Sequence, residues 1–359
     1  MVRRIARAAA AACAVLLLAA CASEPVRARL EFGVESAPEG GRLLWPSPPD
    51  VPRYAYAGVL TGEENFKVDD AARSRASSFL RWLAGLDGRE QNPVVLQRPV
   101  SGVVDEAGRI YVTDASRQGV FVFDEQAGRL DVWDRAQGVR NFVSPVGVAL
   151  GANGELLVAD AELAFVVRLA RDGTPLGVLG EGQLRRPTGL ARDAATGRIY
   201  VADTQSHDVK VFDDRGTLLQ TIGRRGEDPG EFNYPTYLSL AQGELYVTDS
   251  INARVQVFAA ASGEYRRAIG TRGLYVGNMV RPKGVAVDGE RNVYVIESYY
   301  DNLLVYNAQG EFLMPLGGTG SGTGRFFLPA GVWTDERNRV FVADMFNGRV
   351  VVFSFLGGG

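Results

Sequence analysis

The chain has 359 residues, of which 46% are hydrophobic and 23% are charged, and it contains 43 glycines. Its formal net charge is −3 at pH 7, and an acidic chain is a poor candidate for binding nucleic acid. A single histidine and two cysteines leave too few ligands for a metal centre built on these residue types.

Residues 1–20 have the pattern of a bacterial signal peptide. Three arginines precede an apolar run, Ala8 to Leu18, that is too short to act as a membrane-spanning helix. The run ends in Leu-Ala-Ala-Cys, which resembles a bacterial lipobox. The resemblance implies that Cys21 is acylated and becomes the mature N-terminus, which would anchor the protein in a membrane. The alanine after Cys21 implies the outer membrane. The alternative is a plain secretory peptide that contains a cysteine.

Residues 21–52 show no sustained periodicity. The stretch "WPSPPDVP" (45–52) carries four prolines in eight residues, which favours an extended polyproline spacer. We therefore expect residues 21–52 to be a Pro-rich tether that holds the following domain away from the lipid surface.

Beyond the tether, one phrase recurs six times. It reads "IYVTDASRQGVFVF" at 110–123 and "IYVADTQSHDVKVF" at 199–212, with further copies at 156–169, 245–258, 293–306 and 340–353. The acidic residues that close its first half are spaced by 43 to 48 residues: Asp114, Asp160, Asp203, Asp249, Glu297 and Asp344. A glycine, usually two residues after a proline, precedes each phrase except in the fourth copy, where Tyr237 stands at that position.

Each copy has the pattern of four short strands separated by turns of Gly, Asn and Asp. A period in the forties with four strands per unit predicts a β-propeller, and six copies predict six blades. The glycine fits a position where the inner strands converge and a side chain would clash. The phrase, together with the loop "GRRGEDPGEFNYP" (223–235), resembles the NHL repeat, and the resemblance extends over residues 53–355. It implies a six-bladed propeller lipoprotein of the bacterial cell envelope.

The sixth copy lacks its fourth strand. The segment "RYAYAGVLTG" (53–62) matches the fourth strands of other copies, so we expect it to pair with Val350–Ser354 and close the ring. Between this strand and the first copy, apolar residues at helical spacing predict one helical insertion at about 68–86. The expected fold class is thus all-β, with a six-bladed propeller of residues 53–355 closed by an N-terminal strand.

The lone histidine decides between two classes of function. His207 lies four residues after Asp203 in the turn between the second and third strands, where NHL repeats often carry Asn-His-Arg. We interpret it as a structural residue, and we expect the repeated aspartates to accept backbone N–H bonds from the following turns. Peptidyl-hydroxyglycine amidating lyases resemble this fold but need several histidines around a metal.

Four aspartates follow the first strand of their copies and are candidate calcium ligands of a propeller lactonase. Turn formation explains them better, since they sit beside Gly-Arg or Arg-Asn pairs. They are Asp105, Asp193, Asp288 and Asp335.

A binding surface has more support. In a propeller, the turns between the second and third strands (b–c turns) and the loops between blades (d–a loops) lie on one face. Aromatic and arginine side chains, which dominate protein interfaces, gather there. The b–c turns contribute Arg117, Asn252, Tyr299, Tyr300, Phe346 and Asn347. The d–a loops contribute Arg98, Arg186, Phe232, Tyr234, Arg281 and Phe327. We expect Phe232 and Phe327 to wedge between blades. Tyr299 and Tyr300 depart from the repeat pattern beside Glu297, which favours a functional role.

The sequence therefore predicts a lipid-anchored, monomeric propeller that acts without catalysis or cofactor as a binding or assembly scaffold in the cell envelope. Its expected partner is an envelope protein or peptide, or a glycan, with no role in nucleic-acid binding. Its expected location is the outer membrane, facing the periplasm or the cell surface. The alternative function is that of a calcium-dependent propeller hydrolase.

Overall fold

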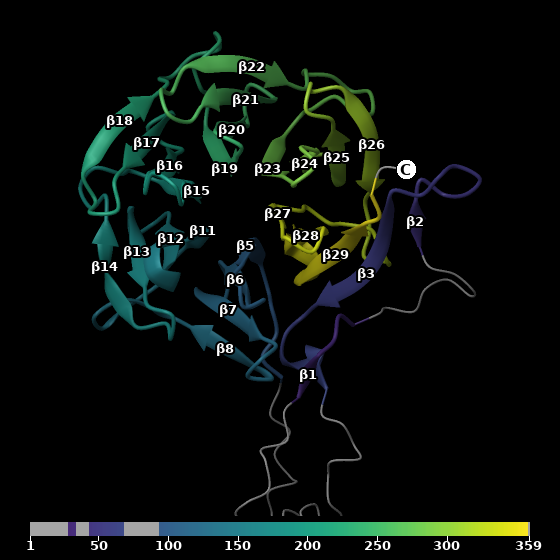
Figure 1. The fold of residues 1–359 in the computed structure, drawn as a ribbon, viewed down its shortest axis with the longest axis horizontal. Helices are drawn as coiled ribbons and strands as arrows, with labels where there is room; N and C mark the ends of the chain where they lie inside the picture. Colours follow the sequence, from purple (N-terminus) through teal and green to yellow (C-terminus); the bar gives the residue numbers. More distant parts are fainter. Residues whose placement is uncertain (1–27, 34–42, 68–92, 358–359) are drawn as a thin grey trace, which may run out of the picture.

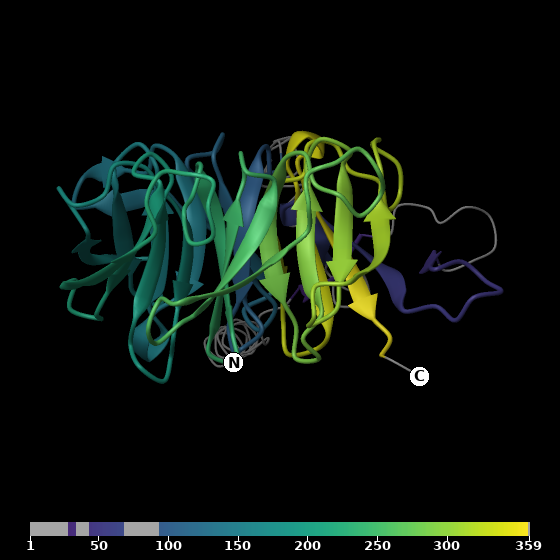
Figure 2. The same ribbon diagram turned by 90° about the horizontal axis from the view of Figure 1, so that it is seen from above.

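The computed structural model describes residues 28–33, 43–67 and 93–357. Six antiparallel sheets stand around a central axis as the blades of a propeller, and each runs from an inner strand a to an outer strand d (Figure 1). Seen from the side, the ring is a thick disc (Figure 2). The fold is thus the all-β, six-bladed propeller that the repeat predicts. The described residues contain only short 3-10 helices besides strands, and none of their helices is long and apolar enough to cross a membrane.

The blades follow chain order. Blade 1 contains β5 (Pro99–Val104), β6 (Ile110–Asp114), β7 (Gly119–Asp124) and β8 (Arg129–Trp133). Blade 2 contains β11 (Pro145–Leu150), β12 (Leu156–Asp160), β13 (Phe165–Leu169) and β14 (Pro175–Leu179). Blade 3 contains β15 (Pro187–Arg192), β16 (Ile199–Asp203), β17 (Asp208–Phe212) and β18 (Leu218–Ile222). Blade 4 contains β19 (Pro235–Ala241), β20 (Glu244–Asp249), β21 (Arg254–Ala259) and β22 (Tyr265–Ile269).

Blade 5 contains β23 (Pro282–Val287), β24 (Val293–Glu297), β25 (Asn302–Tyr306) and β26 (Phe312–Gly317). Blade 6 contains β27 (Val332–Thr334), β28 (Arg339–Asp344), β29 (Arg349–Phe355) and β3 (Tyr54–Leu60). The remaining elements are β1 (Arg29–Leu30), β2 (Leu44–Trp45), η1 (Glu63–Asn65), β4 (Phe66–Lys67), β9 (Arg135–Gln137), β10 (Arg140–Asn141), η4 (Ala152–Gly154) and η5 (Met345–Asn347).

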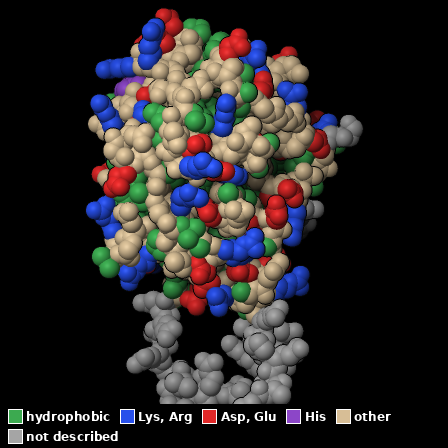
Figure 3. All heavy atoms as spheres, turned by 60° about the vertical axis from the view of Figure 1, so that its left-hand side comes forward, with side chains coloured by type: hydrophobic (Ala, Val, Ile, Leu, Met, Phe, Trp, Pro, Cys, Tyr) green, Lys and Arg blue, Asp and Glu red, His purple; other side chains and the backbone are tan. Residues whose placement is uncertain are grey.

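Burial follows from the stacking of blades. Strands b are buried on both faces, because each blade packs against two neighbours, so each is an apolar run that ends in an acidic residue, as in Ile199–Asp203. Outer strands such as β18 alternate toward solvent and are largely exposed. The core is therefore a series of apolar clusters between adjacent blades. On the outer surface, charges of both signs are interspersed with scattered hydrophobic side chains (Figure 3).

The repeated glycine allows adjacent inner strands to approach closely. A Cβ on Gly147 would lie 2.0 Å from the Thr188 carbonyl oxygen, and one on Gly331 would lie 2.3 Å from that of Val100. Such contacts are too short for any side chain. The clash expected from the sequence is therefore present, and it fixes glycine at this position of strand a.

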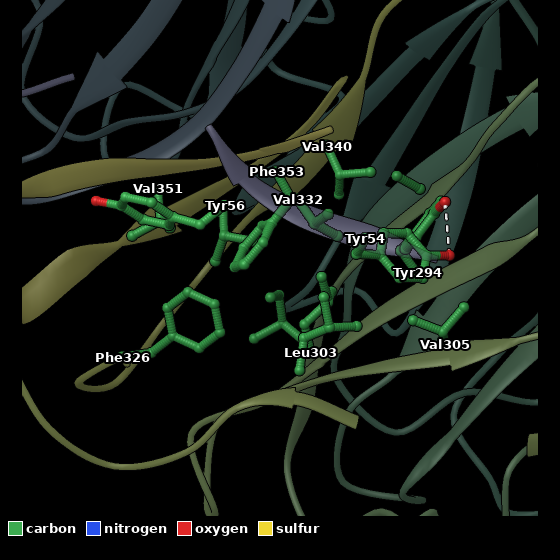
Figure 4. Packing of buried hydrophobic residues seen from close by; sticks show 14 of the residues in the cluster. Tyr54, Tyr56, Tyr294, Leu303, Val305, Phe326, Val332, Val340, Val351 and Phe353 are labelled. Carbon is green, nitrogen blue, oxygen red and sulfur yellow. Dashed lines mark hydrogen bonds between the residues drawn. The ribbon is translucent and has the colours of Figure 1, made fainter. Parts of the chain in front are cut away.

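The first and last blades are joined as the sequence predicts. Strand β3 pairs antiparallel with β29, with Leu60 opposite Val350 and Ala55 opposite Ser354. Tyr54 and Tyr56 are buried in the cluster between blades 5 and 6, where the Tyr54 and Tyr294 hydroxyls lie 3.2 Å apart (Figure 4). The N-terminal strand therefore closes the ring.

Parts of the expected tether pack on the propeller instead of forming a free spacer. Strand β2 pairs with β3 as a fifth strand of blade 6, and its hairpin extends beyond the rim of the disc (Figure 2). Strand β1 pairs with β4, and Gly33 bridges to Val59. The expectation of a tether is thus wrong for these segments, because their backbones pair with strands that would otherwise be edges. The predicted helical insertion at 68–86 lies outside the described residues, as do residues 1–20 and Cys21.

Candidate binding face

The acidic residue at the end of each strand b holds two loops on one face of the disc. The Asp114 carboxylate accepts the N–H groups of Gln97 and Arg98 at 2.6 and 2.9 Å, and those of Ser116 and Arg117 at 3.0 and 2.9 Å. These donors belong to the d–a loop before the blade and to the b–c turn after the strand. The carboxylate thus ties the two together, which confirms and extends the structural role expected for it.

Glu297 performs the same task in blade 5. Its Oε1 accepts the Arg281 N–H at 2.6 Å, and its Oε2 accepts the Tyr300 N–H at 2.9 Å. The departure from aspartate therefore changes the side-chain length and preserves the hydrogen-bonding role. In blades 4 and 6 the carboxylates also pair with Arg254 and Arg349, while burial raises the pKa of Asp249 and Asp344.

His207 has the structural role expected from its position in the repeat. It lies at a left-handed position of the b–c turn with φ 58°, where blade 6 has Gly348 at φ 62°. Its Nδ1 accepts the Tyr234 N–H at 3.2 Å, and the two rings meet edge to face at 4.5 Å. The histidine thereby fastens the next d–a loop. Within the described ranges, no group of three or more His, Cys, Asp or Glu side chains is placed to hold a metal ion.

Two predicted binding residues, both partly exposed, use their amide donors to hold loops. The Asn252 amide donates to the Gly226 carbonyl at 2.9 Å and to Asp249 at 2.8 Å. Asn347 makes the equivalent bonds to Gly320 and Asp344 at 3.0 and 2.7 Å. Their donors are thus occupied, which gives both residues a structural role. Arg117 is exposed, although its Nε donates to the Val95 carbonyl at 3.1 Å.

Large apolar side chains lie exposed on this face along blades 4, 5 and 6. We call this set the apolar arc, with exposed fractions in parentheses: Tyr234 (46%), Ile251 (52%), Tyr299 (57%), Phe327 (44%) and Phe346 (51%). They come from three b–c turns and two d–a loops, whereas the b–c turns of blades 1 to 3 offer polar side chains such as Ser116, Glu162 and Gln205. The five side chains of the arc therefore lie along three consecutive blades.

The aromatic pairs of the arc are preorganised. Tyr299 packs edge to face against the half-buried Tyr300 with ring centroids 4.9 Å apart. Phe327 packs in the same way on Phe346 at 5.7 Å, and the Arg98 guanidinium lies 5.6 Å from the Phe346 ring centroid. Rings held in this way lose little conformational freedom when a partner covers them.

The predicted wedge residue is correct for Phe232 and wrong for Phe327. Phe232 is fully buried between blades, as expected. The equivalent wedge in blade 6 is Phe326, which is also fully buried, while Phe327 points outward. The spacing of the loop motif places Phe326 level with Phe232, but two adjacent phenylalanines leave the sequence ambiguous.

The four aspartates considered as calcium ligands are engaged in their own turns at the opposite face. Asp105 and Asp335 each accept the backbone N–H and the Nε of an arginine four residues later. Asp288 accepts the Tyr294 hydroxyl at 2.7 Å, and Asp193 accepts the Thr196 hydroxyl at 2.6 Å. These aspartates therefore accept hydrogen bonds within their turns, as the sequence predicts.

The site predicted from the sequence does not include two features of the molecule. The tip of the d–a loop before blade 5 exposes three consecutive apolar residues, Leu274 to Val276. It lies at the rim, because Gly277 packs against Phe312 of the outer strand β26. The second feature is Tyr237. The sequence shows that it replaces the repeated glycine, but it does not predict where its side chain points.

Known families and proteins agree with this architecture. A family model described as "6-bladed beta-propeller" matches residues 278–358, and one described as "NHL repeat" matches residues 184–212. The chain is therefore a six-bladed propeller that carries NHL-type repeats.

Individual relatives match only part of this chain. The chain is similar to peptidyl-glycine alpha-amidating monooxygenase B of Xenopus laevis, with 32% identity over 151 residues, which are 38% of this chain and 17% of that protein. The chain thus spans less than a fifth of that relative's length.

Two solved structures share the fold. A gluconolactonase from Xanthomonas campestris matches with a TM-score of 0.56 and 16% identity, covering 76% of this chain and 93% of that one. A chain of the nidogen/laminin complex matches with a TM-score of 0.54 and 18% identity, covering 71% and 90%. At such identities the similarity shows the fold alone.

Proposed function

We propose that the protein is a lipid-anchored binding module of the bacterial cell envelope, which captures an envelope protein or peptide on the apolar arc and acts without catalysis. The observation that carries this proposal is the arc itself. Five large apolar side chains remain exposed on one face although the fold has a core for such residues, and clustered exposed aromatics are typical of interaction sites.

The comparisons support binding without specifying it. A propeller of the same fold belongs to the nidogen/laminin complex, so this scaffold takes part in a protein complex there. Other similar proteins are named as enzymes. In this chain, the four aspartates considered as calcium ligands and the acids at the ends of strands b are engaged in turns and loops. The exposed residues of the arc are interface types rather than nucleophiles or bases. The arc thus favours binding.

The test is capture of envelope proteins by the purified chain. Tyr299→Ala combined with Tyr300→Ala should weaken capture by about 2 kcal/mol, about thirtyfold, because each ring is a rigid apolar anchor. A matched control is Leu274→Ala combined with Tyr275→Ala, which removes two exposed apolar side chains at the rim. Equal capture by both variants at an unchanged melting temperature would reject the arc as the binding surface.

The anchor is tested separately. Cys21→Ser should release the protein from the membrane fraction, because the acyl chains would have no attachment atom. If the Cys21→Ser variant still fractionates with the membrane at an unchanged mature mass, the lipoprotein assignment is excluded. The proposal for the binding face is then unaffected.

A further inference from the structure

The central channel is closed by a tyrosine. In five blades strand a carries the repeated glycine, whereas blade 4 carries Tyr237. Its buried hydroxyl donates to the Val100 carbonyl of blade 1 at 3.2 Å, so the side chain crosses the channel. Below it, a cavity of about 480 Å³ opens among the a–b turns and includes Glu106, Gly151 and Ala194 in its lining. We call the other end of the channel, on the face of the apolar arc, the channel mouth.

One charged residue lies at the wall of this mouth. Lys283 follows the first proline of strand β23, and the equivalent residues of the other blades are neutral: Val100, Val146, Thr188, Thr236 and Ala330. Three of these, Val100, Val146 and Ala330, pack in one cluster with Tyr237 although they come from blades 1, 2 and 6. The strand position therefore faces the channel, and Lys283 is half-buried there.

The positive charge at the mouth has no counter-ion among the described residues. The exposed Arg281 and Arg98 lie in the d–a loops before blades 5 and 1, near enough to repel the Lys283 ammonium. Neither they nor Lys283 have a side-chain hydrogen bond or ion pair to any described residue, and the Arg98 guanidinium lies over the Phe346 ring. Burial, followed by repulsion from Arg281 and Arg98, lowers the pKa of Lys283. An ammonium partly withdrawn from water without a partner is costly, so it indicates a missing anion.

The carboxylates at the ends of strands b are not available to supply that anion. The six strand-end acids are buried beneath the loops and accept backbone N–H groups, as Asp114 and Glu297 show. Glu162 pairs with Arg186 at 2.8 Å. The mouth is therefore a local excess of positive charge in a chain whose net charge is negative.

We propose that the channel mouth binds an acidic peptide segment, whose carboxylates pair with Lys283, Arg98 and Arg281 while its apolar side chains cover Tyr299 and Phe346. This inference rests on the proposed binding function and specifies the chemistry of the partner. Carboxylates form strong charge-assisted hydrogen bonds with ammonium and guanidinium groups. An extended peptide fits because the cations and the apolar arc are spread over several blades, and because Tyr237 crosses the channel between blades 4 and 1.

The direct test uses the purified full chain and a dye-labelled acetylated peptide of alternating glutamate and leucine, read by fluorescence anisotropy at low salt. We expect saturable binding that weakens as salt rises, because the contacts are charged. Lys283→Met should reduce affinity about tenfold. Lys283→Arg should retain most of it. The matched control is Arg215→Gln, which removes one charge from an exposed turn on the opposite face and should change nothing.

Several results would overturn the proposal. They are no binding of the acidic peptide by the wild-type chain, equal binding of a peptide with lysine in place of glutamate, or equal losses in Lys283→Met and Arg215→Gln. Tighter binding of oligouridine RNA or of phosphatidylglycerol vesicles through Lys283 would replace the peptide with another anion. If the peptide fails while the Tyr299 and Tyr300 double variant still loses capture of envelope proteins, only the acidic chemistry is rejected and the binding function stands.

Discussion

The pKa of a carboxylate in this propeller depends on the groups that donate hydrogen bonds to it. Glu244, at the start of β20, accepts hydrogen bonds from both terminal nitrogens of Arg267 at 2.6 and 2.8 Å. It also accepts one from the Tyr246 hydroxyl at 2.8 Å. The hydrogen bond from Arg267 holds the pKa of Glu244 below its usual 4.5, and burial together with Glu244 raises the pKa of Tyr246 to about 12. This ion pair therefore couples stability to pH.

The sign of that coupling follows from proton uptake. Since the pKa of Glu244 is lower in the folded chain, the unfolded chain binds the proton first as pH falls. The stabilisation is complete above pH 4.5 and is lost as pH falls through the folded-state pKa. Glu244→Gln should thus lower the free energy of unfolding by about 1 kcal/mol at pH 7, and the difference from wild type should shrink below pH 4.5. Urea titrations across this range measure it.

The control is Glu264→Gln in the same blade, whose side chain is 66% exposed and pairs loosely with Arg266 at 3.5 Å. This variant should remain close to wild type at every pH. A constant deficit of Glu244→Gln from pH 3 to 7 would contradict the pH coupling and leave only a packing effect.

At the scale of elements, the N-terminal segment shows what the sequence could not specify. Prolines in residues 45–52 favoured a spacer, but backbone pairing with β3 outweighs that preference for β2. Trp45 packs edge to face on Phe353 with ring centroids 5.3 Å apart, and it also covers Gly324. A local pattern of two strand residues carries almost no signal, and the contact that selects it comes from the far end of the chain.

Trp45→Ala should therefore lower the free energy of unfolding by about 2 kcal/mol, because the partly buried ring leaves a gap against Phe353. Val51→Ala, at an exposed position of the same segment, should stay within about 0.5 kcal/mol of wild type. Thermal and urea unfolding give both values. If the two variants are equally stable, β2 is held by its backbone alone and the ring contact contributes nothing.

At the scale of the molecule, the repeat predicted more than any single element. Six copies in register give the blade number, the buried strands, the glycine at the convergence of inner strands and the pairing of the two chain ends. The channel closure by Tyr237 and the uncompensated charge of Lys283 were not predictable in the same way. Both depend on which side chains from different blades meet at the axis, and no local sequence pattern specifies those contacts.

The same reasoning limits the predicted site. Tyr299, Phe346 and Arg281 lie on the face expected of them, because turn positions in a propeller map directly to one end of the disc. Asn252 and Asn347 lie there too, but the next d–a loop takes up their amide donors. Sequence position thus predicts where a side chain is, while its availability depends on neighbours from another blade.

Ring closure makes a prediction about deletions. Removing residues 1–52 deletes β1 and β2, which should cost some stability and leave a folded ring. Extending the deletion to Gly62 also removes β3, with Tyr54, Tyr56 and Leu60 from the core, and exposes the N–H and C=O groups of β29. We expect the longer deletion to aggregate through this open edge. Soluble yield and melting temperature compare the two, and similar values would show that the ring does not depend on β3.

A disulfide across the closure tests the pairing without deletion. Ala55 and Ser354 are opposite each other in β3 and β29, so cysteines there should be within the range of Cα separations that a disulfide requires. In a chain with Cys13 and Cys21 replaced by serine, the pair should form on oxidation and link the two ends of the ring. It should then raise stability by about 4 kcal/mol, because the bond closes a very long loop in the unfolded chain. A cysteine at Ala55 combined with one at Ser262, in the turn between β21 and β22 of blade 4, should stay reduced under the same conditions. Failure of the first pair to crosslink, or equal crosslinking of both pairs, would show that β3 does not close the ring in this register.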